Sequence, residues 1–407
     1  MTEKIVIVGG GHAAAQLIST LRQSDYPGDV VLLGEERWLP YQRPPLSKKY
    51  LAGELDTERL YVKPESFYED RQVDLRLQTK VTGIDREARS LQLDDGKDMS
   101  YDKLVLALGA RIRELDIEGM DLNGVHYLRT LADVQAIKEE LKPGRRLVII
   151  GAGYIGLEVA AVTQKLGLDV TVVEKADRVM SRVVSAEISD FYQIEHTQRG
   201  IKFRLSTDAR ALHGRKRVKS VETSSGEKLP ADIVIVGVGI LPNSELAASA
   251  GLDVDDGVVV DDRCQSSDPA IFAIGDCTRH PSAIYGRMLR LESVQNAVEQ
   301  AKTAGSNLCG IESRYSEVPW FWSDQYDLKL QIAGLSEGYD DVVIRGNPAD
   351  RSFACIYLRE KRLIAVDAVN APKDFVQSKP LIAARAQLDI EQLANAEIDL
   401  KDLLKSD

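Results

Sequence analysis

Short apolar runs, each ending in a glycine-rich turn and leading into helical spacing, occur twice in the chain. The first run covers residues 4–8 and the second covers residues 146–150. Val and Ile dominate both runs, which favours buried β-strands, and the stretches that follow are rich in Ala, Leu and Val. Strand, glycine turn and helix in this order predict the start of a βαβ unit at both places.

One plan continues from each of these starting points. It consists of a second strand, an antiparallel excursion with alternating polar and apolar residues, and a buried strand that returns to the parent sheet. In the first half these elements are predicted at residues 30–33, 73–77 with 90–93, and 103–110, and in the second half at 170–173, 218–228 and 232–239. The internal repetition predicts two similar domains.

The pattern changes near the C-terminus. Helices are predicted at residues 131–141 and 294–308, whereas beyond residue 310 the chain shows strands with aromatic residues, a meander and two polar helices. The predicted fold class is therefore α/β, with two Rossmann-like dinucleotide-binding domains followed by an α+β domain.

Both glycine turns carry a dinucleotide fingerprint. They read Gly9-Gly10-Gly11-His12-Ala13-Ala14 and Gly151-Ala152-Gly153-Tyr154-Ile155-Gly156. The first glycine permits the tight turn, the second lets the backbone approach a pyrophosphate, and the third small residue allows close packing of helix on strand. Glu35 and Glu174 follow the next strand in each half and are placed to bind a ribose. The sequence predicts two dinucleotides bound at once.

Composition and charge narrow the class of protein. At 407 residues the chain exceeds one hydrophobic core, and its net charge of -11 argues against binding nucleic acid or an anionic membrane. No apolar stretch reaches membrane-spanning length, and no leader precedes the first strand, so we expect a cytoplasmic protein. The four cysteines lie far apart, which predicts neither a disulfide framework nor a metal site.

A family resemblance follows from five motifs in order. They are Gly9-x-Gly11-x-x-Ala14, Arg43-Pro44-Pro45-Leu46-Ser47-Lys48, Gly151 through Glu158, Ile274-Gly275-Asp276-Cys277 and Trp320-Phe321-Trp322-Ser323-Asp324-Gln325. Over nearly its whole length the chain resembles the FAD-dependent ferredoxin reductases of the putidaredoxin reductase type, within the glutathione-reductase-like flavoproteins. One departure is Ala107-Leu108-Gly109, where such flavoproteins more often have Ala-Thr-Gly.

The resemblance implies domain boundaries and an FAD site. The FAD domain comprises residues 1–112 and 242–311, the NADH domain residues 113–241, and the C-terminal domain residues 312–407. Asp276 would accept hydrogen bonds from the flavin's ribityl and pyrophosphate region, and Val294 would open a helix directed at the flavin pyrimidine. The implied FAD-binding residues are Gly9, Gly11, His12, Ala13, Ala14, Glu35, Arg43, Lys48, Val81, Ala107, Gly109, Arg129, Asp276, Val294 and Trp322.

The resemblance also implies an NAD site and a set of catalytic residues. Lys48 would lie close to the reactive flavin nitrogen, Tyr154 would shield the flavin face, Glu158 would reach the nicotinamide, and Trp322 would lie beside the flavin. Glu158 has an alternative role in complementing the helix macrodipole, Tyr154 one in packing, and Trp320 is expected to pack a domain interface. The implied NAD-binding residues are Gly151, Gly153, Tyr154, Ile155, Gly156, Glu158, Glu174 and Gly239.

The function that this resemblance implies is electron transfer from NADH through FAD to a [2Fe–2S] ferredoxin that supplies a cytochrome P450 or a ring-hydroxylating oxygenase. Glu174 favours NADH over NADPH by repelling a 2′-phosphate, a preference that nearby Arg178 is able to weaken. A docking face for an acidic ferredoxin is expected at Arg287, Arg290, Lys329 and Lys379, on a monomer or weak homodimer.

Three alternatives stay open. Two are a rubredoxin reductase and a monodehydroascorbate-type reductase, which share the same site residues. The third is a redox-sensing flavoprotein whose NADH binding changes its association with a partner.

Overall fold

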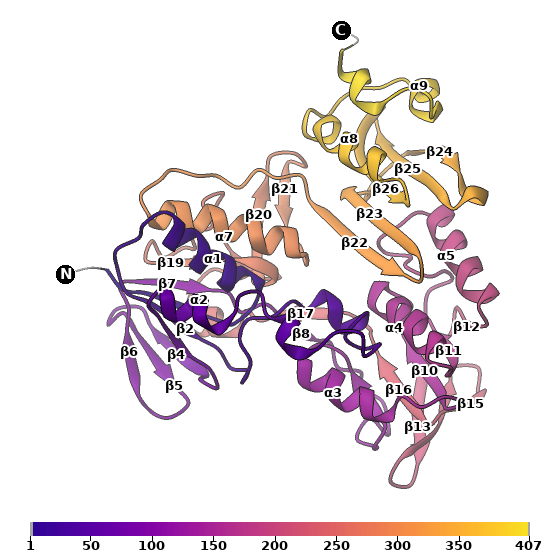
Figure 1. Ribbon diagram of the computed structural model, residues 1–407, viewed down its shortest axis with the longest axis horizontal. Coiled ribbons are helices and arrows are strands. Elements are labelled where there is room, and N and C mark those ends of the chain that lie inside the picture. Colours follow the sequence, from indigo (N-terminus) through magenta and orange to yellow (C-terminus); the bar gives the residue numbers. More distant parts are fainter. Residues whose placement is uncertain (1–2, 406–407) are drawn as a thin grey trace. The chain divides into compact units, whose positions relative to one another are not determined.

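The computed structural model describes residues 3–405 and divides the chain into two compact units (Figure 1). Unit 1 comprises Met1–Gln42, Thr57–Arg111 and Leu241–Pro319, and unit 2 comprises Arg43–Asp56, Ile112–Ile240 and Trp320–Asp407. Residues 43–56 thus join unit 2, although the sequence-based boundaries group them with the FAD domain. Those boundaries stay a prediction.

Unit 1 is built on a five-stranded parallel sheet in the order β19-β7-β1-β2-β3. All four residues of β1 and of β2 are buried, as expected for strands covered on both faces. The strands are β1 (Ile5–Val8), β2 (Val30–Leu33), β3 (Val73–Arg76), β7 (Lys103–Leu106) and β19 (Ile271–Ala273).

Two long helices of unit 1 pack closely against each other (Figure 1). They are α1 (His12–Gln23) and α7 (Val294–Leu308). A Cβ added at Gly305 of α7 would lie 2.8 Å from the Cγ2 atom of Thr20 on α1, so the glycine permits the close approach. The predicted helix at residues 294–308 is confirmed.

The antiparallel excursion of unit 1 is smaller than the sequence suggests. It consists of β4, β5 and β6, whereas residues 73–76 form β3 and pair in parallel with β2. The polar and apolar residues of β3 alternate because this strand lies at the sheet edge. The other elements of unit 1 are β4 (Val81–Asp85), β5 (Ser90–Leu93), β6 (Asp98–Ser100), β18 (Val258–Val259), β20 (Thr278–Ser282), β21 (Arg287–Leu289), α2 (Glu65–Asp70), α6 (Glu245–Ser249), η2 (Thr57–Leu60) and η3 (Gly275–Cys277).

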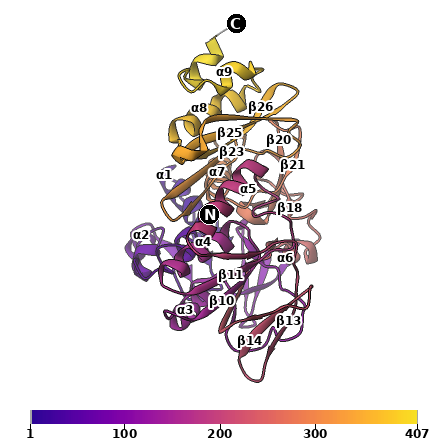
Figure 2. The same cartoon turned by 90° about the vertical axis from the view of Figure 1, so that its right-hand side faces the viewer.

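Unit 2 repeats the plan with a parallel sheet in the order β12-β11-β10-β16-β9. Figure 2 shows β10 and β11 with α4 beside them, as the helix contacts both strands. An antiparallel sheet β13-β14-β15 follows, as the sequence predicts. The elements are β9 (Val125–Tyr127), α3 (Leu131–Glu140), β10 (Arg146–Ile150), α4 (Tyr154–Lys165), β11 (Asp169–Val173), α5 (Ala186–Gln198), β12 (Lys202–Arg204), β13 (Ala209–Gly214), β14 (Val218–Thr223), β15 (Lys228–Pro230) and β16 (Ile233–Val236). Two short strands, β8 (Ala110–Ile112) and β17 (Ile240–Pro242), pair with each other.

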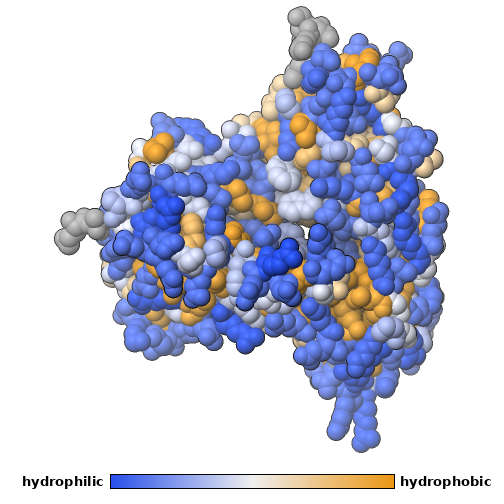
Figure 3. Space-filling model, viewed as in Figure 1, coloured by the Kyte–Doolittle hydropathy of each residue, from blue (hydrophilic) through white to orange (hydrophobic). Residues whose placement is uncertain are grey.

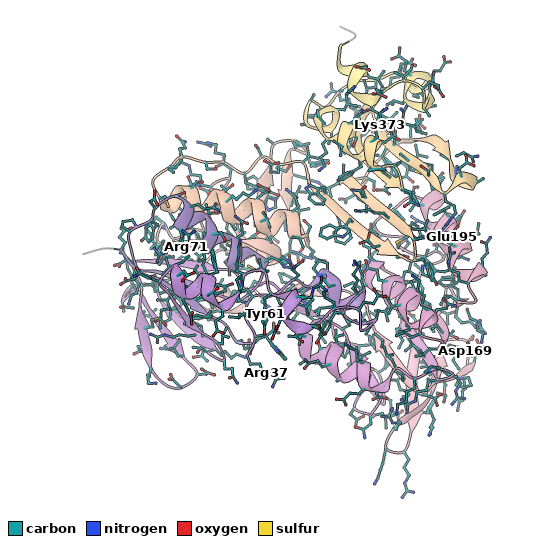
Figure 4. All side chains as sticks on the ribbon, viewed as in Figure 1. Arg37, Tyr61, Arg71, Asp169, Glu195 and Lys373 are labelled. Atoms are coloured by element: carbon teal, nitrogen blue, oxygen red, sulfur yellow. The ribbon has the colours of Figure 1, made fainter. Side chains whose placement is uncertain are left out.

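The C-terminal part of unit 2 is an antiparallel sheet in the order β22-β23-β26-β25-β24, with α8 packed on β23 and β26. Arg351, next to β25, holds Glu195 of α5 at 3.1 Å; Glu195 is labelled in Figure 4. The elements are β22 (Trp320–Gln325), β23 (Leu328–Gly334), β24 (Asp341–Asn347), η4 (Pro348–Asp350), β25 (Ser352–Arg359), β26 (Arg362–Val369), α8 (Pro372–Ala383), α9 (Ile390–Ala394) and η5 (Leu400–Lys405).

The face drawn in Figure 3 is mostly hydrophilic, with apolar residues scattered among polar ones. Among residues 3–405, no helix combines the length and apolar character that crossing a membrane requires.

Candidate functional site

The first fingerprint forms the turn between β1 and α1 in unit 1. At Gly9, with φ of +111°, an added Cβ would lie 2.2 Å from the carbonyl oxygen of Ala107, so only glycine fits. At Gly11 an added Cβ would meet nothing within 4 Å, and this residue caps α1 without a side-chain hydrogen bond. A tight turn, open space and bare helix N–H groups together suit a pyrophosphate.

Other predicted FAD residues gather near this turn. Gly275 of η3 packs on α1 and α7, since a Cβ added there would lie 3.4 Å from the Cβ of Ala13 and 3.7 Å from that of Ala297. Asp276 follows Gly275 in η3, which contacts α7. Gly109 follows β7 with φ of +63°, and Val81 is buried at the start of β4. Glu35 forms a solvent-exposed ion pair with Lys80 at 3.0 Å.

The second fingerprint forms the turn between β10 and α4 in unit 2. A Cβ added at Gly151 would lie 2.4 Å from the Gly237 carbonyl oxygen, and one added at Gly156 would lie 2.1 Å from the Gly151 carbonyl oxygen. At Gly153 it would meet nothing within 4 Å. The space therefore opens at the same position of both turns, and the second turn also fits a pyrophosphate.

Glu174 directly follows β11 and hydrogen-bonds to this second turn. Its carboxylate accepts hydrogen bonds from the backbone N–H of Ala152 at 2.6 Å and from that of Ala176 at 2.8 Å. Gly239 follows β16 with φ of +111°, and Ile155 is exposed on the first turn of α4.

Arg178 binds the segment that leads from β11 to α5. Its guanidinium donates to Ser189 Oγ at 2.7 Å and to the carbonyl oxygens of Ser181, Val184 and Ser185. These bonds hold the chain between β11 and α5. The influence of Arg178 on nucleotide choice stays a prediction.

A buried carboxylate, Glu158, lies one turn into α4 and is 3% exposed. Its Oε2 atom lies 2.7 Å from Lys48 Nζ and accepts from Ser47 Oγ at 2.5 Å, whereas its Oε1 atom accepts from Ser323 Oγ at 2.6 Å. A buried ion pair is costly unless further hydrogen bonds satisfy it, and here two hydroxyls complete the set. Three distant segments of unit 2 thus meet at one charge.

The segment that supplies Lys48 begins with two prolines. Pro44 and Pro45 occupy the first turn of the short helix η1 (Pro44–Ser47), where missing N–H groups cost nothing. The preceding residue Arg43 donates from Nη1 to the carbonyl oxygen of Arg129 at 2.8 Å, so these two predicted FAD residues lie together in unit 2. Lys48, the residue after η1, forms the ion pair with Glu158.

The aromatic residues of β22 divide between the two faces of the strand. Trp320 and Trp322 lie on one face with ring centroids 5.7 Å apart, and Trp320 also contacts Phe375 of α8. Phe321 points the other way and lies 5.0 Å from the ring of Tyr154. The sequence predicted Tyr154 and Trp322 as site residues but missed Phe321, which is the aromatic partner of Tyr154.

Ser47 and Ser323 were also missed, although the strand that carries Ser323 leaves a signal in the sequence. Phe321, Ser323 and Gln325 alternate along one strand, and a face that combines Ser with Gln is unusually polar for a strand buried in a sheet. Glu158 is likewise the single acidic residue of the Ala- and Val-rich helix α4. Buried polar groups are normally hydrogen-bonded, so a buried acid and a buried polar strand face are expected to contact each other.

None of the four cysteines forms a disulfide in the part of the chain that the structure describes. Cys264, Cys277 and Cys355 are buried and Cys309 is half-buried, all as free thiols. Burial raises the pKa of Cys277 to about 11, which keeps this thiol protonated and unreactive at neutral pH.

Comparison with known proteins agrees with the two turns. Residues 3–301 match the pyridine nucleotide-disulphide oxidoreductase family, and residues 320–404 match the reductase C-terminal family. The chain belongs to these families. A probable ferredoxin reductase, CtmF, of Castellaniella defragrans is 43% identical over 403 residues, covering 98% of each chain.

Solved structures give the same result. The chain matches the covalent putidaredoxin reductase–putidaredoxin complex with a TM-score of 0.97 and 41% identity, covering 99% of this chain and 98% of that one. It matches the ferredoxin reductase for the CYP199A2 system from Rhodopseudomonas palustris with a TM-score of 0.96 and 43% identity, covering 98% and 99%. The predicted family and α/β fold class are confirmed, as is the oxidoreductase class.

A rubredoxin-NAD(+) reductase of Pseudomonas putida is 40% identical over 370 residues, covering 91% of this chain and 96% of that protein. Relatives with different iron-protein acceptors therefore share this fold and length.

Proposed function

We propose that this protein is an NADH:ferredoxin oxidoreductase that binds FAD at the turn of unit 1 and NADH at the turn of unit 2. The observation that carries the proposal is the pair of glycine turns with matching open positions, one of them next to the buried Lys48–Glu158 pair. When bound, FAD accepts two electrons from NADH as a hydride and returns them singly to a one-electron acceptor.

The residues of this chain bind, orient and stabilise charge. In unit 1, the FAD residues are those predicted from the sequence, namely Gly9, Gly11, His12, Ala13, Ala14, Glu35, Val81, Ala107, Gly109, Asp276 and Val294. In unit 2, the turn from Gly151 to Gly156 holds the NADH pyrophosphate and Glu174 holds the adenosine ribose. Lys48 and Glu158 place one positive and one negative group at the reacting end of the nucleotide, where a hydride leaves a cationic nicotinamide.

The electron acceptor we favour is a [2Fe–2S] ferredoxin, in a system ending in a cytochrome P450 or a ring-hydroxylating oxygenase. The support is the similarity to putidaredoxin reductase and to the CYP199A2 system reductase. Rubredoxin is the competing acceptor, supported by the rubredoxin-NAD(+) reductase. We place the reaction in the cytoplasm, where NADH is available, and expect a monomer or weak homodimer.

A titration tests this function directly. The purified protein is titrated with NADH anaerobically, and the flavin absorbance near 450 nm is expected to bleach with about one equivalent. A [2Fe–2S] ferredoxin and a rubredoxin are then added separately, and reoxidation of the flavin is followed. Faster reoxidation by rubredoxin would replace the ferredoxin proposal, and a colourless protein that cannot be reconstituted with FAD would refute the function.

The proposed docking face for the ferredoxin is formed by basic side chains. Lys379 on α8 lies 4.6 Å from the ring of Trp320 and 4.3 Å from that of Phe375, beside the exposed Val376. A cation held over aromatic rings next to an apolar residue suits the edge of an interface. Lys329 is exposed on β23 and Arg287 lies on β21. Arg290 is bound by Asp256 at 3.0 Å and by Glu292, so its charge is already largely balanced.

Charge reversal separates docking from chemistry. Lys379→Glu is expected to slow ferredoxin reduction about tenfold at low salt while ferricyanide reduction stays within twofold, because only the protein acceptor needs the docking face. Arg290→Glu serves as the comparison and is expected to have a smaller effect. Equal losses with both acceptors would remove Lys379 from the docking face.

A further inference from the structure

Two polar residues occupy the buried face of β22. Ser323 and Gln325 are both fully buried. Ser323 Oγ contacts Glu158 Oε1 at 2.6 Å, and Gln325 Nε2 contacts Ser323 Oγ at 3.2 Å. Their polarity costs stability in a buried strand unless it satisfies a partner, and the partner here is the carboxylate of the candidate site.

The chain of hydrogen bonds continues into helix α5, which also carries the labelled Glu195 (Figure 4). His196 is fully buried, and its Nε2 atom lies 2.8 Å from Gln325 Oε1. Its Nδ1 atom lies 3.4 Å from the hydroxyl of Tyr326. Tyr326 is half-buried under the guanidinium of Arg199, 4.5 Å from the ring centroid. Four residues thus connect Glu158 with a cation near the surface of unit 2.

The direction of every hydrogen bond in this chain is determined by Glu158. A carboxylate only accepts, so the Ser323 hydroxyl must donate its single proton to Glu158. Gln325 must then donate to Ser323 with its NH₂ group, which leaves its carbonyl oxygen facing His196. Therefore His196 carries its proton on Nε2, and its Nδ1 atom accepts from Tyr326.

Burial supports this arrangement of the ring. Desolvation lowers the pKa of His196 to about 4, so that the imidazole is neutral at pH 7. A neutral imidazole has one donor and one acceptor nitrogen, as the chain requires. All donors then point toward Glu158, and their dipoles add to stabilise its negative charge.

We propose that Gln325 and His196 are positioning residues, which orient the Ser323 hydroxyl toward Glu158 and thereby hold Glu158 against Lys48. The inference rests on the proposed role of the Lys48–Glu158 pair in NADH oxidation. The chain orients and does not conduct protons, because the amide of Gln325 stands between Ser323 and His196 and does not readily exchange a proton. Through these hydrogen bonds the C-terminal sheet of unit 2 contributes to the proposed NADH site.

The tautomer of His196 gives a test that does not depend on turnover. Side-chain ¹⁵N NMR of the histidine-labelled holoenzyme distinguishes a protonated Nε2 from a protonated Nδ1, and His196→Phe assigns the signal. We expect the Nε2–H tautomer at pH 7, and loss of this strong preference in Gln325→Leu. A protonated Nδ1 atom, or a doubly protonated ring at pH 7, would overturn the proposal.

Rapid kinetics give the second test. We expect the limiting rate of flavin reduction by NADH to fall roughly tenfold in Ser323→Ala and roughly threefold in Gln325→Leu and His196→Phe, with the NADH dissociation constant within about twofold. Ser323→Thr keeps the hydroxyl and is expected to restore most of the rate. Matched controls are Gln198→Leu on the exposed end of α5 and His213→Phe on β13, both expected at the wild-type rate.

The two failures are distinguishable. Unchanged reduction rates in Ser323→Ala and Gln325→Leu would overturn the positioning role, whatever the tautomer. A wild-type flavoprotein that NADH does not reduce would refute the proposed function, and the NMR measurement would still decide whether the donor chain exists.

Discussion

The two glycine turns share a backbone and differ in the side chain that stands seven residues after the first glycine. In unit 1 this residue is Gln16, which donates to Thr20 of the same helix at 3.2 Å. In unit 2 it is Glu158, buried among Lys48, Ser47 and Ser323. Under the proposed function, the comparison teaches that the turn itself only binds a nucleotide, and that the side chain at this position distinguishes a site that holds its nucleotide from a site where the nucleotide reacts.

The largest effects are expected when a side chain is added at the first glycine of each turn, which tests whether both turns bind a nucleotide. Gly9→Ala puts a Cβ 2.2 Å from Ala107 O, and Gly151→Ala puts one 2.4 Å from Gly237 O, both at strongly positive φ. A clash with backbone at such a φ costs about 3 kcal/mol or more, so each affinity is expected to fall roughly a hundredfold. Flavin content and NADH titration measure the two losses, which should be separate: Gly9→Ala loses FAD, and Gly151→Ala keeps it.

Controls for these variants isolate the clash from the strain of a positive φ. Gly96 has φ of +81° and Gly226 has φ of +82°, and an added Cβ meets nothing within 4 Å at either. Gly96→Ala and Gly226→Ala are expected to bind both nucleotides normally. Loss of FAD from Gly151→Ala would contradict the assignment of one nucleotide to each turn.

Substitutions at Glu158 and Gln16 test whether the side chain at this position determines the rate of flavin reduction. Glu158→Gln removes the carboxylate that balances Lys48 and is expected to slow flavin reduction by NADH about thirtyfold, measured by stopped flow. Gln16→Glu alters a half-buried residue of α1 and is expected to change the rate less than twofold. The comparison fails if both variants reduce their flavin at the wild-type rate.

The two ribose acids give a smaller contrast. Glu174 is tied to two backbone N–H groups, whereas the side chain of Glu35 is 69% exposed beside Lys80. Glu174→Ala is expected to lower the ratio of kcat/KM for NADH over NADPH about tenfold, since it removes both the ribose acceptor and the repulsion of a 2′-phosphate. Glu35→Ala is expected to weaken FAD binding less than threefold. A ratio unchanged in Glu174→Ala would place nucleotide choice elsewhere.

Each unit also contains a buried histidine that is expected to lower its stability at acidic pH. Burial lowers the pKa of both His196 in unit 2 and His280 in unit 1 to about 4, against about 6.5 in the unfolded chain. Since the unfolded chain binds the extra proton first, stability is full above pH 6.5 and falls as the pH drops toward 4.

The expected loss is up to about 3 kcal/mol for each histidine, or a few degrees in the apparent Tm. His280→Phe and His196→Phe should each flatten the fall in Tm between pH 7 and pH 5, and thermal scans at both pH values measure it. The more exposed His213, in His213→Phe, is the control. Equal slopes in all variants would exclude the two buried rings as the cause.

Features set by neighbouring residues were predicted from the sequence, whereas contacts between residues far apart in the chain were not. The strands and helices of both turns and the helix at residues 294–308 follow from local patterns, and the structure contains them. The alternation at residues 73–76 misled, because an edge strand of a parallel sheet is exposed on one side and alternates like an antiparallel strand. Ser47 and Ser323 lay beyond local reasoning because each gains its meaning only from Glu158, more than a hundred residues away.

The position of Ser323 has a consequence for synthesis on the ribosome. Lys48 and Glu158 are synthesised early, but the third donor to the carboxylate lies in the last quarter of the chain. The C-terminal sheet that carries Ser323 must form before all hydrogen bonds of Glu158 are made. A nascent chain arrested before β22 would contain Glu158, Lys48 and Ser47 but not the third donor to the carboxylate. Under the proposed function, full activity therefore requires the complete chain, because a protein shortened at Pro319 would keep both glycine turns and lose Ser323.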